Sequence, residues 1–414
     1  MNAQHKRSKR ALVLAGGGIS GAVYELGALR AVDDLLSTHT VNDFDMYVGT
    51  SAGSLVGACL ANGITTRELL RTLEGALPET GSLRRDHILA PNLRGLAKRS
   101  RRLPGVLFRR TLDAVMHPRQ FSPLDWMWHM LEGLPTGVYS GHGIEGYLRK
   151  LLGTRGVNSF ADLQKELYIV ATELDTGDRA VFGSGALRDV PISQAVAAST
   201  AMPIVYEPVR IDGVDYIDGG VRGTASLDIA IERGAKLILC INPLVPFDNS
   251  DRKLGQSIAD EGMQAIGNQV FRTFIHAGLH YHLKNLRHKH ADVDIILIEP
   301  RRDDALVFAD HVMRYSTRMK LARHGYESAT LRLADQYDYY KSVLARHGIA
   351  ISRRRVAAEL AQLLESDDLE RVQQLLEGSL RPTRLTRPNK SWRTAHLANI
   401  LGDLEQSLDD LADR

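Results

Sequence analysis

A serine flanked by two glycines, in the pattern Gly49-x-Ser51-x-Gly53, is the feature that most constrains this chain. It follows a short apolar run at residues 44–48, which has the length of a strand, and precedes a small-residue segment at 54–62, which is typical of a helix. A serine in a sharp turn between strand and helix is pushed out of the sheet, and flanking glycines let the turn close without a Cβ clash. We therefore predict an exposed Ser51 hydroxyl that points toward the amide groups at the start of the helix.

A run of three glycines at residues 16–18 lies between an apolar run at 11–15 and a helical pattern at 20–36. In that pattern the apolar residues are spaced three and four apart, as they are on one face of a helix. Strand, helix and second strand make a βαβ unit, whose parallel strands and right-handed connection bring both loops to one edge of the sheet. We expect the glycine loop beside Ser51, where its N–H groups can stabilise a developing oxyanion.

The same loop also spells G-x-G-x-x-G through Gly16, Gly18 and Gly21, and this fingerprint supports a rival interpretation as a dinucleotide-dependent oxidoreductase. That interpretation requires an acidic residue at the carboxyl end of the second strand, where it would hold the ribose. The serine turn occupies that end instead, while Asp43 and Asp45 lie at the opposite end. The spacing therefore favours a hydrolase.

Apolar runs and turn residues downstream complete an α/β pattern. Strands are indicated at residues 166–173, 179–182, 209–217, 236–242 and 294–298, and helices at 66–77, 140–152 and 192–201. The hairpin over 209–217 leads directly into Asp218. Beyond Leu306 the pattern is helical, interrupted by a polar linker at 381–393 and closed by an acidic amphipathic helix at 396–411. We predict an α/β fold with helices on both faces of a mainly parallel sheet, plus a helical C-terminal region.

A basic segment at residues 82–134 follows the second strand and its helices as a helical cap. Between Arg84 and Arg110 it carries nine Arg or Lys residues and a single acid, interleaved with apolar side chains. Such a mixture suits an interface with anionic lipid. A solvated basic face over an ordinary cap is the alternative. We expect peripheral membrane contact through residues 84–130.

The overall composition excludes some classes of partner. The net charge is only +3, so bulk electrostatics give no case for nucleic acid. No apolar run reaches the ~18 residues needed to cross a bilayer, and residues 1–10 are typical of a basic tail rather than a signal peptide. Cys59 and Cys240 lie in apolar runs without metal-ligand spacing, which indicates buried free thiols and a reducing compartment. We expect a cytoplasmic protein, peripheral at the membrane.

The histidine-rich stretch from His276 to His290 is a candidate for a metal centre. His276 and His280 can share a helix face, but no Asp, Glu or Cys joins them at the spacing of a ligand. We therefore expect a solvated or partly buried helix face, with no metal and no cofactor.

Four blocks, in their order along the chain, together resemble the patatin-like phospholipase family over roughly residues 10–245. They are Gly16-Gly17-Gly18 with Gly21, then Gly49-Thr50-Ser51-Ala52-Gly53, then Ser199 to Pro203 with Tyr206 and Pro208, then Asp218-Gly219-Gly220. The resemblance implies a three-layer patatin-like domain over residues 11–300, followed by the helical region 301–414. It also implies a Ser–Asp dyad that hydrolyses acyl esters of lipids. Ser51 would be the nucleophile, Asp218 the base, and amides of the Gly16, Gly17 and Gly18 loop the oxyanion hole.

The chain departs from that family at three positions. Ser20 stands where an Arg is common, and Thr224 and Ser226 stand in place of an Asn and a Pro. Because the implied oxyanion donors are backbone groups, a changed side chain at Ser20 does not by itself remove them. The change at Ser20 does put in question the rigidity of the loop and any role of the Arg that is common there.

We therefore expect an enzyme that hydrolyses a fatty acyl ester, in a phospholipid or lysophospholipid, with no histidine in its chemistry. Three alternatives stay open. The first is the same chemistry on a neutral lipid or thioester, acyl transfer included. The second is the dinucleotide-dependent oxidoreductase, against which Gly49 argues. The third is a membrane-binding protein that has lost catalysis, against which intact Ser51 and Asp218 argue.

Overall fold

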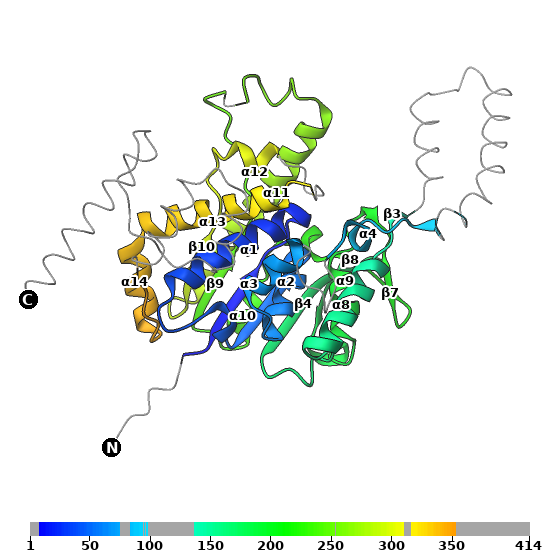
Figure 1. The fold of residues 1–414 in the computed structure, drawn as a ribbon, viewed down its shortest axis with the longest axis horizontal. Helices are drawn as coiled ribbons and strands as arrows, with labels where there is room; N and C mark the ends of the chain where they lie inside the picture. The colour runs from blue at the N-terminus through cyan, green and yellow to red at the C-terminus, as the bar shows by residue number, and fades with distance from the viewer. Residues whose placement is uncertain are drawn as a thin grey trace, which may run out of the picture.

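The computed structural model describes residues 8–74, 83–93, 95, 97, 136–252, 254–309 and 316–352 of the 414-residue chain. Within these residues, eight strands form one central sheet in the order β10-β9-β1-β2-β4-β8-β7, with β5 also paired to β4 (Figure 1). The strands are β1 (Arg10–Leu14), β2 (Met46–Thr50), β4 (Glu166–Glu173), β5 (Arg179–Phe182), β7 (Val209–Ile211), β8 (Val214–Asp218), β9 (Leu237–Ile241) and β10 (Asp294–Ile298).

The sheet is mainly parallel, which confirms the prediction. Strands β10, β9, β1, β2 and β4 run parallel to one another, whereas β5 and β8 pair antiparallel with β4, and β7 pairs antiparallel with β8. Parallel strands are buried on both faces, so their sequences read as continuous apolar runs. The buried segments of β1 (RALVL) and β9 (LILCI) have this character. Strand β1 pairs with β2 on one side and with β9 on the other, so it lies in the interior of the sheet.

Helices cover both faces of the sheet and give the molecule three layers (Figure 1). They are α1 (Gly18–Leu35), α2 (Ala52–Ala61), α3 (Thr66–Glu74), α4 (Arg85–Ile88), α8 (His142–Arg155), α9 (Ile192–Ser199), α10 (Leu227–Glu232), α11 (Met263–Lys289), α12 (Ala305–Ala309), α13 (Arg318–Asp335) and α14 (Tyr337–Arg346). Because side chains alternate along a strand, Leu12 and Leu14 of β1 pack with α1, α2, α9 and α13, while Ala11 and Val13 pack with α10 and α11.

Helix α13 packs against α1 closely enough to require glycines at the crossing. A Cβ on Gly27 of α1 would overlap the carbonyl oxygen of Ala322, and a Cβ on Gly325 of α13 would lie 2.5 Å from the carbonyl oxygen of Tyr24. Apolar side chains of α13, such as Tyr326, join the same core as α1. The described part of the C-terminal region, residues 301–309 and 316–352, therefore shares its core with the sheet domain.

Several predictions concern residues beyond those described. Most of the basic segment 82–134, the linker 381–393 and the helix 396–411 lie outside the described residues.

Cys59 and Cys240 are buried and free, as expected. Within the described part of the chain, none of the helices combines the length and apolar character that crossing a bilayer requires.

Candidate active site

Ser51 lies in a strained turn between β2 and α2. Its backbone has φ 53° and ψ −127°, a conformation that residues with a side chain rarely adopt. The flanking glycines are required by close backbone approach. A Cβ on Gly49 would lie 2.5 Å from Ser54 Cα, and a Cβ on Gly53 would lie 2.5 Å from the carbonyl oxygen of Leu14. The sharp turn expected from the serine pattern is thus present.

The hydroxyl of Ser51 does not point toward the helix amides. It donates a hydrogen bond of 2.5 Å to Oδ2 of Asp218, the last residue of β8. Ser51 is also only 4% exposed, so the expectation of an exposed hydroxyl was wrong. The physical reason is that antiparallel β8 pairs with β4, which sets a carboxylate over the serine turn.

Asp218 is held on both of its carboxylate oxygens. Oδ1 accepts a hydrogen bond of 2.7 Å from the Gly220 N–H, while Oδ2 accepts the Ser51 hydroxyl. Burial raises the pKa of Asp218 from 3.8 to about 6, although the two hydrogen bonds oppose that shift. A Cβ on Gly219 would overlap the carbonyl oxygen of Val170, so the tight turn after β8 requires a glycine. The carboxylate is therefore fixed, desolvated and basic for an aspartate.

Ser199, the last residue of α9, links the serine turn to β4 by hydrogen bonds. Its Oγ accepts a hydrogen bond of 2.8 Å from the Ser51 N–H and donates one of 2.6 Å to the carbonyl oxygen of Val170 in β4. Sequence reasoning assigned no role to this residue. Its place at the start of the block 199–203 was the available signal.

The glycine loop lies directly beside Ser51. A Cβ on Gly16 would lie 3.0 Å from Ser51 Cβ, and a Cβ on Gly17 would lie 2.6 Å from Pro243 Cγ. The Gly16 N–H donates to the carbonyl oxygen of Thr224 at 3.2 Å. Among the described residues, no acceptor is bound by the N–H groups of Gly17 and Gly18, which stand at the start of α1. These two amides are available to a ligand, whereas the Gly16 amide is not.

The three departures from the family pattern lie around this loop. Thr224 supplies the carbonyl oxygen that holds Gly16, so its contribution is made by the backbone. Ser20 is buried in the first turn of α1, and Ser226 directly precedes α10. The three changed side chains leave the backbone N–H groups of Gly17 and Gly18 in place.

An apolar cavity opens from Ser51 and Asp218. Its walls come from α1, α2 and the segment that follows α9, and they include Ile19, Leu26, Leu55, Met202 and Tyr206. A smaller hollow, which Ser51 and Asp218 also line, is bounded by Gly17, Leu244, Phe271 and Ile275. The serine and aspartate thus border two mainly apolar spaces.

The histidines of α11 lie away from these two residues. Within the described part of the chain, no histidine is hydrogen-bonded to Ser51 or Asp218. His282 approaches Asp228. His276 and His280 instead face Glu299, just after β10, so the fold supplies the acidic neighbour that sequence spacing lacks.

A family model described as patatin-like phospholipase matches residues 12–231, more than half of the chain. This chain belongs to the patatin-like phospholipase family. The matched segment runs from β1 to α10 and contains the glycine loop, Ser51 and Asp218. Strands β9 and β10 and helix α11 lie beyond it.

Curated relatives are distant and longer than the matched region. A protein described as a probable lipid hydrolase, 463L of Invertebrate iridescent virus 6, is 26% identical over 54% of this chain and 63% of its own length. An uncharacterized protein, YqhO of Bacillus subtilis, is 26% identical over 50% of this chain and 62% of its own length. The chain therefore spans less than two thirds of the length of these relatives.

Two solved structures show weak overall likeness. VipD from Legionella pneumophila aligns with a TM-score of 0.32 at 14% identity, covering 89% of this chain and 83% of its own. The type III effector protein ExoU of Pseudomonas aeruginosa aligns with a TM-score of 0.32 at 15% identity, covering 97% and 64%. These scores are too low to extend the likeness to the site.

Proposed function

We propose that this chain is a serine acyl hydrolase that cleaves fatty acyl esters of phospholipids or lysophospholipids through Ser51 and Asp218. The observation that carries the proposal is the 2.5 Å hydrogen bond from Ser51 Oγ to Asp218 Oδ2, formed on a strained turn beside two available amides. A nucleophile bonded to its base next to an oxyanion site is the constellation that acyl transfer needs.

In the first half of the reaction, Ser51 Oγ attacks the ester carbonyl carbon and its proton passes to Asp218 Oδ2. The C–O bond to the leaving alcohol then breaks, and the alcohol takes the proton from Asp218. In the second half, water gives a proton to Asp218 and attacks the acyl carbon. The bond from that carbon to Ser51 Oγ then breaks, Ser51 takes the proton back from Asp218, and the fatty acid is released. A base works best when its pKa is near the working pH, and burial brings the pKa of Asp218 to about 6.

The oxyanion of each tetrahedral intermediate would lie against the N–H groups of Gly17 and Gly18. Both amides are at the start of α1, where the helix dipole adds positive potential. Loss of one such donor costs about 3–4 kcal/mol of transition-state stabilisation. Gly16, whose amide is already bonded to Thr224, would shape the loop rather than donate.

The apolar cavity beside Ser51 suits a fatty acyl chain. Its walls carry aliphatic and aromatic side chains such as Leu26, Leu55 and Met202, which would bury methylene groups at about 0.8 kcal/mol each. The same chemistry on a neutral lipid or a thioester remains the second candidate, because an apolar cavity of this kind would hold the acyl chain without selecting the leaving group. A dinucleotide is disfavoured, since Asp45 bonds Arg10 at the end of the sheet opposite the glycine loop.

The membrane contact expected through residues 84–130 is part of this proposal. Three apolar side chains lie exposed on neighbouring segments near its start, with exposed fractions of 70% for Leu93, 53% for Val138 and 84% for Ile204. Val138 and Ile204 belong to the small paired strands β3 (Gly137–Tyr139) and β6 (Ile204–Tyr206), and the Asn92 N–H donates to the Val138 carbonyl. Met202, which closely precedes β6 in the chain, lines the apolar cavity beside Ser51.

Labelling with a fluorophosphonate probe tests the proposed nucleophile. The wild-type protein should react at one serine, in the peptide that contains Ser51, and Ser51→Ala should abolish both labelling and release of fatty acid from phosphatidylcholine micelles. Ser257→Ala, at an exposed serine far along the chain, is the matched control. Labelling at another serine, or more than a tenth of the activity in a folded Ser51→Ala variant, would remove Ser51 from the mechanism.

Co-sedimentation with liposomes tests the membrane contact. Binding should be stronger for anionic than for neutral vesicles and should weaken as salt rises, because each basic residue near the surface contributes up to about 1 kcal/mol before screening. Replacing the Arg residues between Arg84 and Arg110 with Gln should reduce binding at low salt. Equal binding of both vesicle types would favour the solvated basic face.

A further inference from the structure

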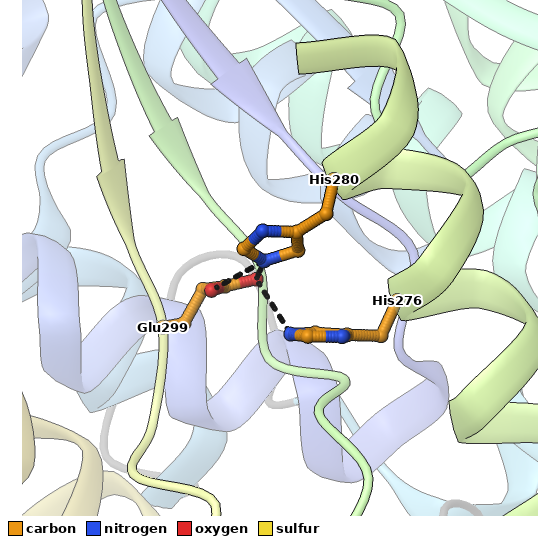
Figure 2. A group of neighbouring side chains, drawn as sticks. All are labelled: His276, His280 and Glu299. Atoms are coloured by element: carbon orange, nitrogen blue, oxygen red, sulfur yellow. Dashed lines mark hydrogen bonds and ion pairs between the residues drawn. The ribbon is translucent and has the colours of Figure 1, made fainter. Parts of the chain in front are cut away.

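Three potential metal ligands converge at the carboxyl edge of the sheet, outside the proposed dyad. His276 and His280 lie one turn apart on α11, and Glu299 follows the end of β10 (Figure 2). The His280 Nε2 is 3.1 Å from Glu299 Oε2, and the His276 Nε2 is 3.9 Å from Glu299 Oε1. All three ligand atoms lie within 4.8 Å of one another.

These separations are close to those of a bound transition metal. In a tetrahedral zinc site with bonds of about 2.0–2.2 Å, ligand atoms lie roughly 3.3 Å apart. One pair already meets that spacing, and the others need small side-chain rotations to contract. The two imidazole rings are tilted by 37° with centroids 4.1 Å apart, and the Nε2 atoms of both rings lie near the Glu299 carboxylate.

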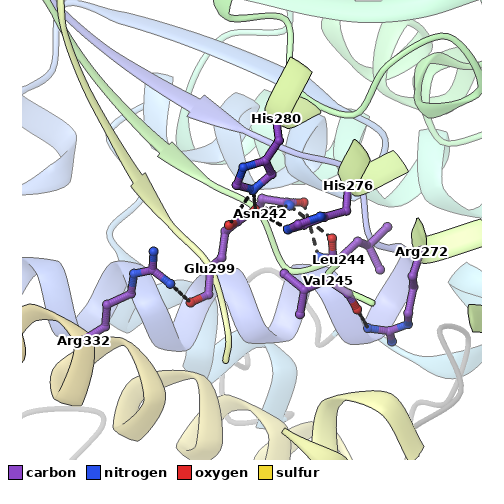
Figure 3. A network of polar contacts seen from close by, with 8 residues as sticks. All are labelled: Asn242, Leu244, Val245, Arg272, His276, His280, Glu299 and Arg332. Atoms are coloured by element: carbon purple, nitrogen blue, oxygen red, sulfur yellow. Dashed lines mark hydrogen bonds and ion pairs between the residues drawn. The ribbon is translucent and has the colours of Figure 1, made fainter. Parts of the chain in front are cut away.

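Neighbouring groups hold Glu299 in place. The Asn242 Nδ2 group donates to Glu299 Oε1 at 2.8 Å, and the Arg332 guanidinium donates to the Glu299 carbonyl oxygen at 3.1 Å (Figure 3). The Glu299 side chain is 6% exposed. Outer hydrogen bonds of this kind fix the orientation of a ligating carboxylate and are a regular feature of metal sites.

The cluster is reachable from solvent. His280 and Glu299 line a cavity of about 690 Å³ between α11, β10, the end of α13 and the start of α14, and Arg332 and Tyr337 lie on its wall. An ion can enter from this cavity, and its fourth coordination position would face it. Two imidazoles and one carboxylate with an open position form a ligand set that zinc uses.

We propose that His276, His280 and Glu299 bind one divalent transition-metal ion, for which zinc is the best fit. The ion would join α11 to β10 and serve as a structural clamp. It would not contact the reacting atoms, because β10 lies three strands from β2 and adjacent strands are separated by about 4.8 Å. The clamp would still act near the dyad, since Ile275 and Phe271 of the same helix line the hollow beside Gly17.

Equilibrium dialysis of the full chain against zinc chloride, after treatment with a chelator, tests the proposal without any measurement of enzyme activity. The wild type should bind one ion per chain, and His276→Ala with His280→Ala should weaken binding by about 100-fold or more. Glu299→Gln provides a second variant that keeps both histidines. His288→Ala, at an exposed histidine of the same helix, is the matched control and should bind as the wild type does.

Two further readouts separate a built site from surface adsorption. Zinc should raise the thermal unfolding midpoint of the wild type and the control, but not of the double variant, since an ion bound only to the folded state stabilises it. X-ray absorption of the zinc protein should report nitrogen and oxygen ligands with two imidazoles and no sulfur. No stoichiometric binding, or equal binding by wild type and double variant, would overturn the proposal and leave only a hydrogen bond between His280 and Glu299.

Discussion

At the scale of single residues, Asp218 combines deep burial with a hydrogen bond to Ser51, the proposed nucleophile. Because the carboxylate must be ionised to accept the Ser51 proton, and burial raises its pKa to about 6, kcat/KM should fall about tenfold per pH unit below about pH 6 and level off above it. Asp218→Asn should be nearly as damaging as Ser51→Ala, with a loss of several orders of magnitude. A pH–rate profile of ester hydrolysis measures the first effect and single-point assays the second.

The outcome that would contradict this dyad is a strong effect of a histidine. Alanine at His276, His280 or His282 should change kcat by less than about tenfold, because these side chains lie beside Glu299 or Asp228 rather than Ser51. A thousandfold loss of kcat in a folded histidine variant would favour a serine–histidine–aspartate triad instead of the dyad.

Glu25 of α1 is a second buried acid, and the proposed chemistry makes no use of it. It is fully buried, and burial raises its pKa well above the ordinary 4.5, although a backbone hydrogen bond with Ala15 opposes that shift. The folded protein therefore keeps a proton that the unfolded chain releases. As pH rises above 4.5, the free energy of unfolding should fall on account of this group.

Glu25→Gln removes that titration while keeping the side-chain shape. The variant should melt higher than the wild type by on the order of 3 °C at pH 8, and by much less at pH 4, where both states of the wild type hold the proton. Thermal unfolding at the two pH values, followed by circular dichroism, measures the difference. An equal shift at both would show that Glu25 does not remain protonated in the fold.

At the scale of elements, the crossing of α1 and α13 sets the position of the helix that carries the glycine loop. Gly27→Ala should lower the free energy of unfolding by about 3 kcal/mol, because the new Cβ overlaps the Ala322 carbonyl oxygen and the two helices must separate. The control is Gly146→Ala in α8, where a Cβ meets nothing within 4 Å. That change should raise stability by about 0.5–1 kcal/mol. Urea unfolding curves of both variants compare them, and equal effects would contradict a tight crossing.

Elements with strong local patterns could be predicted from the sequence, and contacts between distant elements could not. Strand β4 was predicted with its observed bounds because an apolar run between turn residues marks it. The exposure of Ser51 was predicted wrongly, since it depends on what β8 brings over the turn. The Glu299 neighbour of His276 and His280 was missed for the same reason, because a strand and a helix meet there only in the folded chain.

At the scale of the whole molecule, the family match ends at residue 231, but residues beyond it also contribute to the hydrophobic core. Strand β9 pairs with the open side of β1, and α11 covers the face that β1 shares with α10. A fragment of residues 1–231 should therefore fail to fold, whereas residues 1–352 should fold, because the shorter fragment leaves an interior strand unpaired and apolar surface uncovered. Circular dichroism and gel filtration of the two fragments would distinguish these outcomes. A monomeric, folded 1–231 fragment would show that the later strands are dispensable.

The position of β1 inside the sheet has a consequence for synthesis on the ribosome. Strand β1 begins at Arg10 and its neighbour β9 at Leu237. At about 5–20 residues per second, the first strand emerges roughly 12–45 s before the partner that closes its second edge. Through that interval β1 presents an unpaired apolar edge, which is a natural substrate for chaperones. Asp218 also emerges late, so Ser51 would acquire its base only after half of the chain has been made.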